Sequence, residues 1–109
     1  MMTIKLPGII QKYVDASNGH NVQSILSCFS DEAVVRDERE EHRGKKSIEG
    51  WLVKTIEKYK FQFEPLGVKD DDAAVVVAVE VSGTFDGSPV TLDYHFTIEN
   101  EKIASLTIE

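Results

Sequence analysis

The 109-residue chain has little cysteine, no long apolar run and fewer basic than acidic residues. Its single cysteine, Cys28, cannot form an internal disulfide, and the amino terminus has no signal-peptide pattern, so we expect a cytoplasmic protein. No stretch approaches the roughly 18 apolar residues of a membrane-spanning helix, which argues against a membrane partner. The net charge of −7 argues against nucleic acid, because phosphates would be repelled.

Binding motifs that depend on a fixed residue spacing are also missing. The three histidines, His20, His42 and His95, lack the spacing of metal ligands, and no glycine-rich turn of the kind that holds a nucleotide joins a strand to a helix. Basic residues do gather between positions 36 and 46, but acidic residues interrupt them, as is typical of a solvated hairpin. We therefore expect no metal, no cofactor and no nucleic-acid partner.

The chain does contain a clear change of hydrophobic period, from helical in its first part to alternating in its second. The helical pattern predicts a first helix from about Ile9 to Asn18-Gly19 and a second, short helix that Asn21 caps. A third helix begins at Gly44 and carries one broad apolar stripe, formed by Ile48, Trp51, Leu52, Thr55, Ile56 and Tyr59.

Short β-branched and alternating runs predict the strands. Residues 33–37 form a strand with a short return near 41–43, and further strands follow at about 60–69, 73–83, 89–99 and 102–108. Turns are expected at Asp70-Asp71-Asp72, Asp86-Gly87-Ser88-Pro89 and Glu99-Asn100-Glu101. The element order α-α-β-β-α-β-β-β-β predicts one α+β domain over residues 1–109, with antiparallel strands and the helices on one face.

The alternation also separates the two faces of the predicted sheet. Tyr94 and Phe96 should meet the helices, whereas Asp93 and His95 should point away from them. The strand at 73–83 is apolar on both faces for most of its length, so its outer face should also be covered. We therefore predict a homodimer through the outer sheet face, with polar contacts from Glu80, Asp93 and His95.

Several short motifs follow one another in a definite order. They are an aromatic residue in the first helix, Asn-Gly-His-Asn between helices, Cys-Phe-Ser-Asp-Glu-Ala-Val before the first strand, His-Arg-Gly before the third helix and a late Tyr-His-Phe. With the element order, they resemble the nuclear-transport-factor-2-like superfamily, specifically its SnoaL-like and ketosteroid-isomerase-like branch, over nearly the whole chain. The resemblance implies a curved antiparallel sheet wrapped around the helices as a cone whose open end admits a small apolar or aromatic molecule.

The resemblance also implies a catalytic pair. Tyr13 matches the hydroxyl donor of the isomerases and Asp37 their proton-shuttling carboxylate, with Asp37 pointing inward and Arg36 outward. A carboxylate in an apolar cavity has a raised pKa and is a better base toward a C–H beside a carbonyl, while the tyrosine stabilises the oxygen that becomes negative. The ligand-binding wall of the cone would include Trp51, Tyr94 and Phe96.

The chain also departs from the family pattern. Tyr94 stands where the isomerases have a second acid, and Asp93, one residue away, should face the other side of the sheet. This departure argues against steroid isomerisation itself. In the cyclases an acid and a histidine on a late strand act together, but Asp93 and His95 should both point outward, so we do not carry that site over.

Each assignment has a structural alternative. Asp37 is either a pocket base or a rim residue paired with Arg36 or Arg43, and Tyr13 is either a donor or a core tyrosine with a polar neighbour. Two functions therefore remain open. The protein is a cofactor-independent isomerase or cyclase of an apolar carbonyl compound, or a non-catalytic module for ligand binding or dimerisation. Neither the residues nor the resemblance identifies the substrate.

Overall fold

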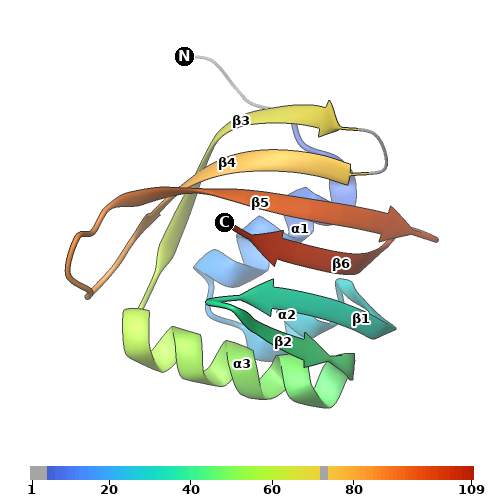
Figure 1. Ribbon diagram of the computed structural model, residues 1–109, viewed down its shortest axis with the longest axis horizontal. Coiled ribbons are helices and arrows are strands. Elements are labelled where there is room, and N and C mark those ends of the chain that lie inside the picture. The colour runs from blue at the N-terminus through green and yellow to red at the C-terminus, as the bar shows by residue number, and fades with distance from the viewer. Residues whose placement is uncertain (1–4, 72–73) are drawn as a thin grey trace.

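The computed structural model describes residues 5–71 and 74–109, which form three helices and six strands. In chain order these are α1 (Gly8–Asn18), α2 (Val22–Leu26), β1 (Phe29–Asp37), β2 (Glu40–Arg43), α3 (Gly44–Tyr59), β3 (Gln62–Asp71), β4 (Ala74–Ser82), β5 (Val90–Glu99) and β6 (Lys102–Ile108). The order is the predicted one, so the α+β class is confirmed (Figure 1).

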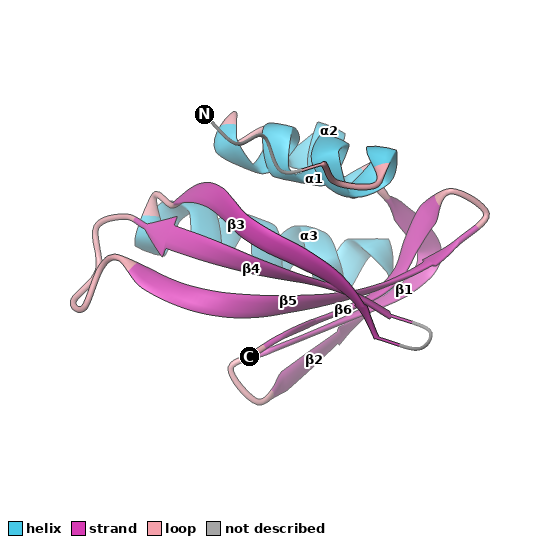
Figure 2. Cartoon of the chain, turned by 90° about the horizontal axis from the view of Figure 1, so that it is seen from above, coloured by secondary structure: helices cyan, strands magenta, loops and turns pink. Residues whose placement is uncertain are grey.

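The strands form one curved sheet in the order β2-β1-β6-β5-β4-β3. Neighbouring strands are antiparallel except β1 and β6, which run parallel and join the beginning of the sheet to the end of the chain. The three helices lie together on the concave side, and the sheet bends around α3 (Figure 2). This arrangement is the open cone that the resemblance implies.

Local sequence accounts for the helices. In α1 the buried positions are Ile10, Tyr13, Val14 and Ser17, as the period predicts. The side-chain oxygen of Asn21 accepts a hydrogen bond from the Ser24 N–H at 3.1 Å and so caps α2. Helix α3 begins at Gly44, whose φ of 82° is one that side chains disfavour. No helix in the described part of the chain is long and apolar enough to cross a membrane.

Two strand boundaries differ from the prediction because of pairing along the sheet. Strand β1 begins at Phe29 instead of Ala33, since Phe29 pairs with Ile103 of β6. Strand β3 continues to Asp71, through residues expected to turn, because Asp70 and Asp71 pair with β4. The third residue of that predicted turn, Asp72, lies outside the described residues.

The two sheet faces are as predicted. Tyr94 and Phe96 are buried toward the helices, and Asp93 is exposed on the outer face. On β1, Val35 is fully buried and Arg36 is exposed, so the next residue, Asp37, turns toward the concave side. The carboxylate of Asp37, at the end of β1, therefore lies on the inner side of the cone.

Candidate functional site

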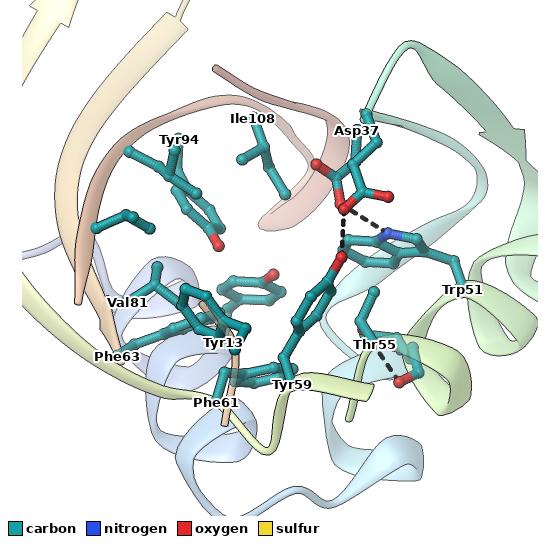
Figure 3. Close-up of a pocket in the computed structure, with 15 residues that line it drawn as sticks. Tyr13, Asp37, Trp51, Thr55, Tyr59, Phe61, Phe63, Val81, Tyr94 and Ile108 are labelled. Carbon is teal, nitrogen blue, oxygen red and sulfur yellow. Dashed lines mark hydrogen bonds between the residues drawn. The ribbon is translucent and has the colours of Figure 1, made fainter. Parts of the chain in front are cut away.

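A cavity of about 230 Å³ lies between the concave face of the sheet, α3 and the β4–β5 connection (Figure 3). Aromatic and aliphatic side chains form most of its wall. Within the described residues, Asp37 and Glu38 are the only charged side chains that line it. The cavity is smaller than the roughly 300–1,000 Å³ of a pocket for drug-sized molecules, so it suits a compact ligand.

Asp37 lies at the mouth of this cavity. The indole N–H of Trp51, on α3, donates a hydrogen bond to Asp37 Oδ2 at 3.1 Å. Burial raises the pKa of Asp37; the Trp51 hydrogen bond opposes this rise, and the adjacent charge of Glu38 adds to it. The side chain is only partly buried, which leaves it within reach of solvent.

The alternative ion pairs of Asp37 are not formed. Arg36 Nε lies 3.1 Å from Glu41 Oε1, and Arg43 Nε lies 2.6 Å from Glu41 Oε2. Both arginines thus pair with Glu41 on the outer side of the hairpin. Asp37 is left facing the cavity without an arginine partner.

Two tyrosines bring hydroxyl groups into the same space. Tyr13 on α1 and Tyr94 on β5 are 2% and 4% exposed, and both point their hydroxyls into the cavity (Figure 3). Neither hydroxyl is hydrogen-bonded to another residue of the cavity wall. Burial raises the pKa of both phenols; for Tyr13 a hydrogen bond with Ser17, behind the cavity wall, opposes the rise, and the nearby Asp37 adds to it for both. Both phenols therefore remain protonated at neutral pH.

Phe96 does not line the cavity, although the alternation of β5 places it on the same face as Tyr94. Its ring lies 5.5 Å from that of Tyr13 and 6.3 Å from that of Tyr94, and its side chain is 1% exposed. Helix α1 covers this part of the strand. Phe96 therefore supports the two tyrosine rings from behind, whereas Trp51 does line the cavity.

Two residues at the mouth carried no assigned role in the sequence analysis. The Tyr59 hydroxyl, at the end of α3, donates to Glu38 Oε1 at 2.5 Å and so joins the helix to the β1–β2 turn. Tyr59 could have been found, because Trp51, Thr55 and Tyr59 recur every fourth residue on one face of α3. Glu38 gives no such signal, since it belongs to a turn and has a positive φ of 52°.

The β4–β5 connection closes the mouth from the other side. The Thr84 N–H donates to the Tyr59 carbonyl oxygen at 2.8 Å, and a Cβ atom at the preceding Gly83 would overlap that same oxygen. Glycine is therefore required for this close approach. The approach places the Phe85 ring 5.5 Å from the Tyr59 ring at the cavity mouth.

Other polar residues of interest lie outside the cavity. The His42 ring packs 6.0 Å from the Trp51 ring, and His42 is not part of the wall. His95 lies on the outer sheet face, where its Nε2 is 3.1 Å from Glu109 Oε2. Among residues 5–71 and 74–109, no three histidine, cysteine, aspartate or glutamate side chains converge as metal ligands.

Comparison with known proteins agrees with this geometry. The family model of the SnoaL-like domain matches residues 10–106. A Sinorhizobium meliloti structure that is provisionally named a polyketide cyclase shares 38% identity, with a TM-score of 0.91 over 95% of each chain. No curated protein matches the chain significantly.

More distant structures share the fold. A Catenulispora acidiphila protein with a ketosteroid-isomerase-like fold, solved in complex with trimethylamine, has 17% identity and a TM-score of 0.82, covering 96% of this chain and 86% of its own. A nuclear-transport-factor-2-like protein from Cytophaga hutchinsonii has 14% identity and a TM-score of 0.78, covering 99% and 91%. On the family match and the 38% relative, this chain belongs to the SnoaL-like family of the nuclear-transport-factor-2-like superfamily.

Proposed function

We propose that the protein binds a compact, largely apolar carbonyl compound in the cone and catalyses its isomerisation or cyclisation without a cofactor. One observation carries the proposal: the partly buried carboxylate of Asp37 and two phenol hydroxyls, those of Tyr13 and Tyr94, face the same apolar cavity. A base and oxyanion donors within one water-poor space are what enolisation requires.

In the proposed reaction, Asp37 is the only group that takes up and releases a proton. Asp37 accepts a proton from the carbon next to the carbonyl, the C–H electron pair becomes a C=C bond, and the carbonyl π pair moves onto oxygen. Tyr13 and Tyr94 donate hydrogen bonds to that oxygen as its negative charge develops. Asp37 then returns the proton at another carbon, or the enolate carbon attacks a second carbonyl to close a ring and the alkoxide oxygen that results takes the proton from Asp37. The raised pKa of Asp37 suits it to both directions of transfer.

The comparisons support a small-molecule ligand. The 38% identical Sinorhizobium meliloti relative carries the provisional name of a cyclase, and the Catenulispora acidiphila protein of the same fold was solved with a small amine. Native mass spectrometry of the purified protein should identify a ligand carried through purification. A panel of cyclic ketones of similar size provides substrates that do not depend on that identification.

Enolisation can be measured on this panel without knowledge of the natural product. In D₂O, an enolising enzyme exchanges the C–H beside the carbonyl for deuterium, and NMR of the ketone reports the rate. We expect enzyme-dependent exchange that falls by about 10²-fold or more in Asp37→Asn. A matched control is Glu40→Gln, which removes an exposed acid of the same hairpin that does not line the cavity. Equal exchange in wild type and Asp37→Asn would refute the base assignment.

One observation favours the second candidate, a non-catalytic binding module: Asp37 lies at the mouth, where solvent reaches it. The carboxyl titration of Asp37 by NMR separates the two functions. A base in a water-poor cavity titrates above the usual aspartate value and shifts when a ligand binds. A titration at the ordinary value that no ligand alters, together with binding but no exchange, would establish the binding module instead.

A further inference from the structure

The charge that lines the cavity is of one sign. Asp37 and Glu38 are adjacent and both face it, and no lysine, arginine or histidine belongs to its wall within the described chain. Of the three arginines of the hairpin, Arg36 and Arg43 pair with Glu41 outside the cavity, and Arg39 in the turn does not belong to the cavity wall. Partial burial of Asp37 against this apolar wall disfavours its charged form, and a cation inside the cavity would offset that cost.

Two basic side chains close to these acids, those of His42 and Lys58, are separated from the cavity by aromatic rings. His42 packs against Trp51, whose indole N–H bonds to Asp37. Lys58 Nζ lies 5.0 Å from the ring centroid of Tyr59, whose hydroxyl bonds to Glu38. Neither basic side chain lines the cavity. Each therefore leaves the inner side of the carboxylates open to a ligand.

Aromatic rings stand beside both acids. Trp51 is hydrogen-bonded to Asp37, Tyr59 to Glu38, and Phe85 lies edge-to-face with Tyr59. Aromatic faces attract cations because the ring quadrupole is negative on its faces, and alkylated ammonium groups are typical ligands because they lose little hydration on binding. Carboxylates and rings together at one end of a cavity have the chemistry of a site for an alkylated ammonium group.

A second, independent feature indicates that the ligand also has a polar atom deeper in the cone. The Tyr94 side chain is 4% exposed, and its hydroxyl points into the cavity and bonds to no other residue of the wall (Figure 3). A buried phenol usually has a hydrogen-bond partner. A carbonyl or hydroxyl oxygen of the ligand would supply it.

We propose that the cavity selects a positively charged ligand, a protonated or quaternary amine on a compact apolar body that also carries an oxygen. Its cation would lie between Asp37, Glu38 and the rings at the mouth, and its oxygen would reach Tyr94. The inference rests on the proposed function only in taking the cavity as the ligand site. The two acids then have different roles. Glu38 neutralises the cation, and Asp37 remains available for proton transfer. A cation near the carbonyl also favours the negative enolate oxygen.

A pair of soluble probes of equal shape tests this proposal. They are 3-hydroxyphenyltrimethylammonium, which is a cation, and 3-tert-butylphenol, in which carbon replaces the nitrogen. Binding is followed by calorimetry and by the fluorescence of Trp51, the only tryptophan of the chain. At neutral pH and low salt, we expect the cation to bind about tenfold or more tightly than the neutral probe.

Variants separate a local effect from the general attraction of an acidic protein for cations. Glu38→Gln and Asp37→Asn should each reduce the preference for the cation severalfold. Glu40→Gln, which removes the same charge outside the cavity, should keep most of it. Glu38 is exposed, so its replacement tests the proposal even if the Asp37 variant folds poorly.

Each result has a definite meaning. A preference for the cation that depends on Glu38 and Asp37 supports the proposal. Equal or tighter binding of 3-tert-butylphenol overturns it and leaves the cavity as a site for neutral ligands, as the proposed function allows. A preference that falls equally in Glu40→Gln overturns it in favour of surface charge. Failure of both probes to bind overturns this proposal, whereas the deuterium exchange of the cyclic ketones decides the proposed function separately.

Discussion

Asp37 combines partial burial with the absence of an arginine partner, and this has a consequence for stability. Burial raises its pKa, Glu38 adds to the rise, and the contacts with Trp51 and His42 oppose it. An acid whose native pKa exceeds its unfolded value of about 3.9 binds its proton more tightly in the native state. Asp37 therefore costs stability increasingly as pH rises through the interval between these two values.

The substitution Asp37→Asn removes this cost. The variant should match wild type below about pH 3.9 and be equally or more stable at neutral pH, in contrast to most substitutions of partly buried residues. Urea unfolding between pH 4 and pH 8 measures the difference, with the exposed Asp93→Asn as a control. A loss of more than about 1 kcal/mol at pH 7 would show that the Trp51 hydrogen bond outweighs the burial cost.

The two phenol hydroxyls should matter for function and little for stability. Tyr13→Phe and Tyr94→Phe keep the packed rings and remove only groups that bond to no other residue of the cavity wall. We expect each free energy of unfolding to change by less than about 1 kcal/mol. Deuterium exchange of the ketones should fall by about 10²-fold or more, as when an oxyanion donor is removed. A large loss of stability with normal exchange would instead identify core tyrosines without a chemical role.

The side chain of Asn18 makes two hydrogen bonds that attach helix α1 to strand β3. Its Nδ2 donates to the Phe63 carbonyl oxygen at 3.0 Å, and its Oδ1 accepts from the Phe63 N–H at 2.7 Å. Because Phe63 lines the cavity, this attachment also holds one wall of the site. The helix terminus and the edge strand are thus one unit in the construction of the cone.

The substitution Asn18→Ala breaks both hydrogen bonds and should lower the free energy of unfolding by about 2 kcal/mol, about 1 for each bond. Urea unfolding measures the loss, and probe binding should weaken with it because Phe63 becomes less fixed. Asn18→Asp keeps the acceptor and loses the donor, so we expect a smaller loss. Unchanged stability in Asn18→Ala would mean that water replaces the side chain at this strand edge.

The helices and most strands could be predicted because their signals are local. The period of α1 and the cap at Asn21 follow from neighbouring residues, whereas the inward direction of Asp37 was implied only by the family resemblance. The parallel contact between β1 and β6 could not be predicted, since it joins segments at opposite ends of the chain. Nor could the depth of Phe96, because alternation gives the face of a strand and not which part of that face a helix covers.

The outer face of the sheet remains uncovered by any described element (Figure 2). It is mixed in character: Val76 is 4% exposed and Ala78 is half-buried, beside hydroxyls such as those of Thr97 and Ser105, which lie 2.5 Å apart. We propose that a second copy of the chain packs on this face. The cavity lies on the opposite, concave side, so such a homodimer would leave both mouths open to ligand.

Two arginine substitutions test the position of this interface. Ala78→Arg places a charge on the outer face of β4 and should convert a dimer to monomer, because an unpaired buried charge is costly. Val53→Arg makes the same change on the exposed side of α3, where Val53 is 42% exposed, and should leave the dimer intact. Sedimentation velocity at micromolar concentrations gives the molecular mass of each variant.

Since the dimer face and the cavity are separate, the Ala78→Arg variant should still bind the probes. A monomeric wild type would refute the dimer, whereas dissociation by Val53→Arg alone would place the interface on the helices.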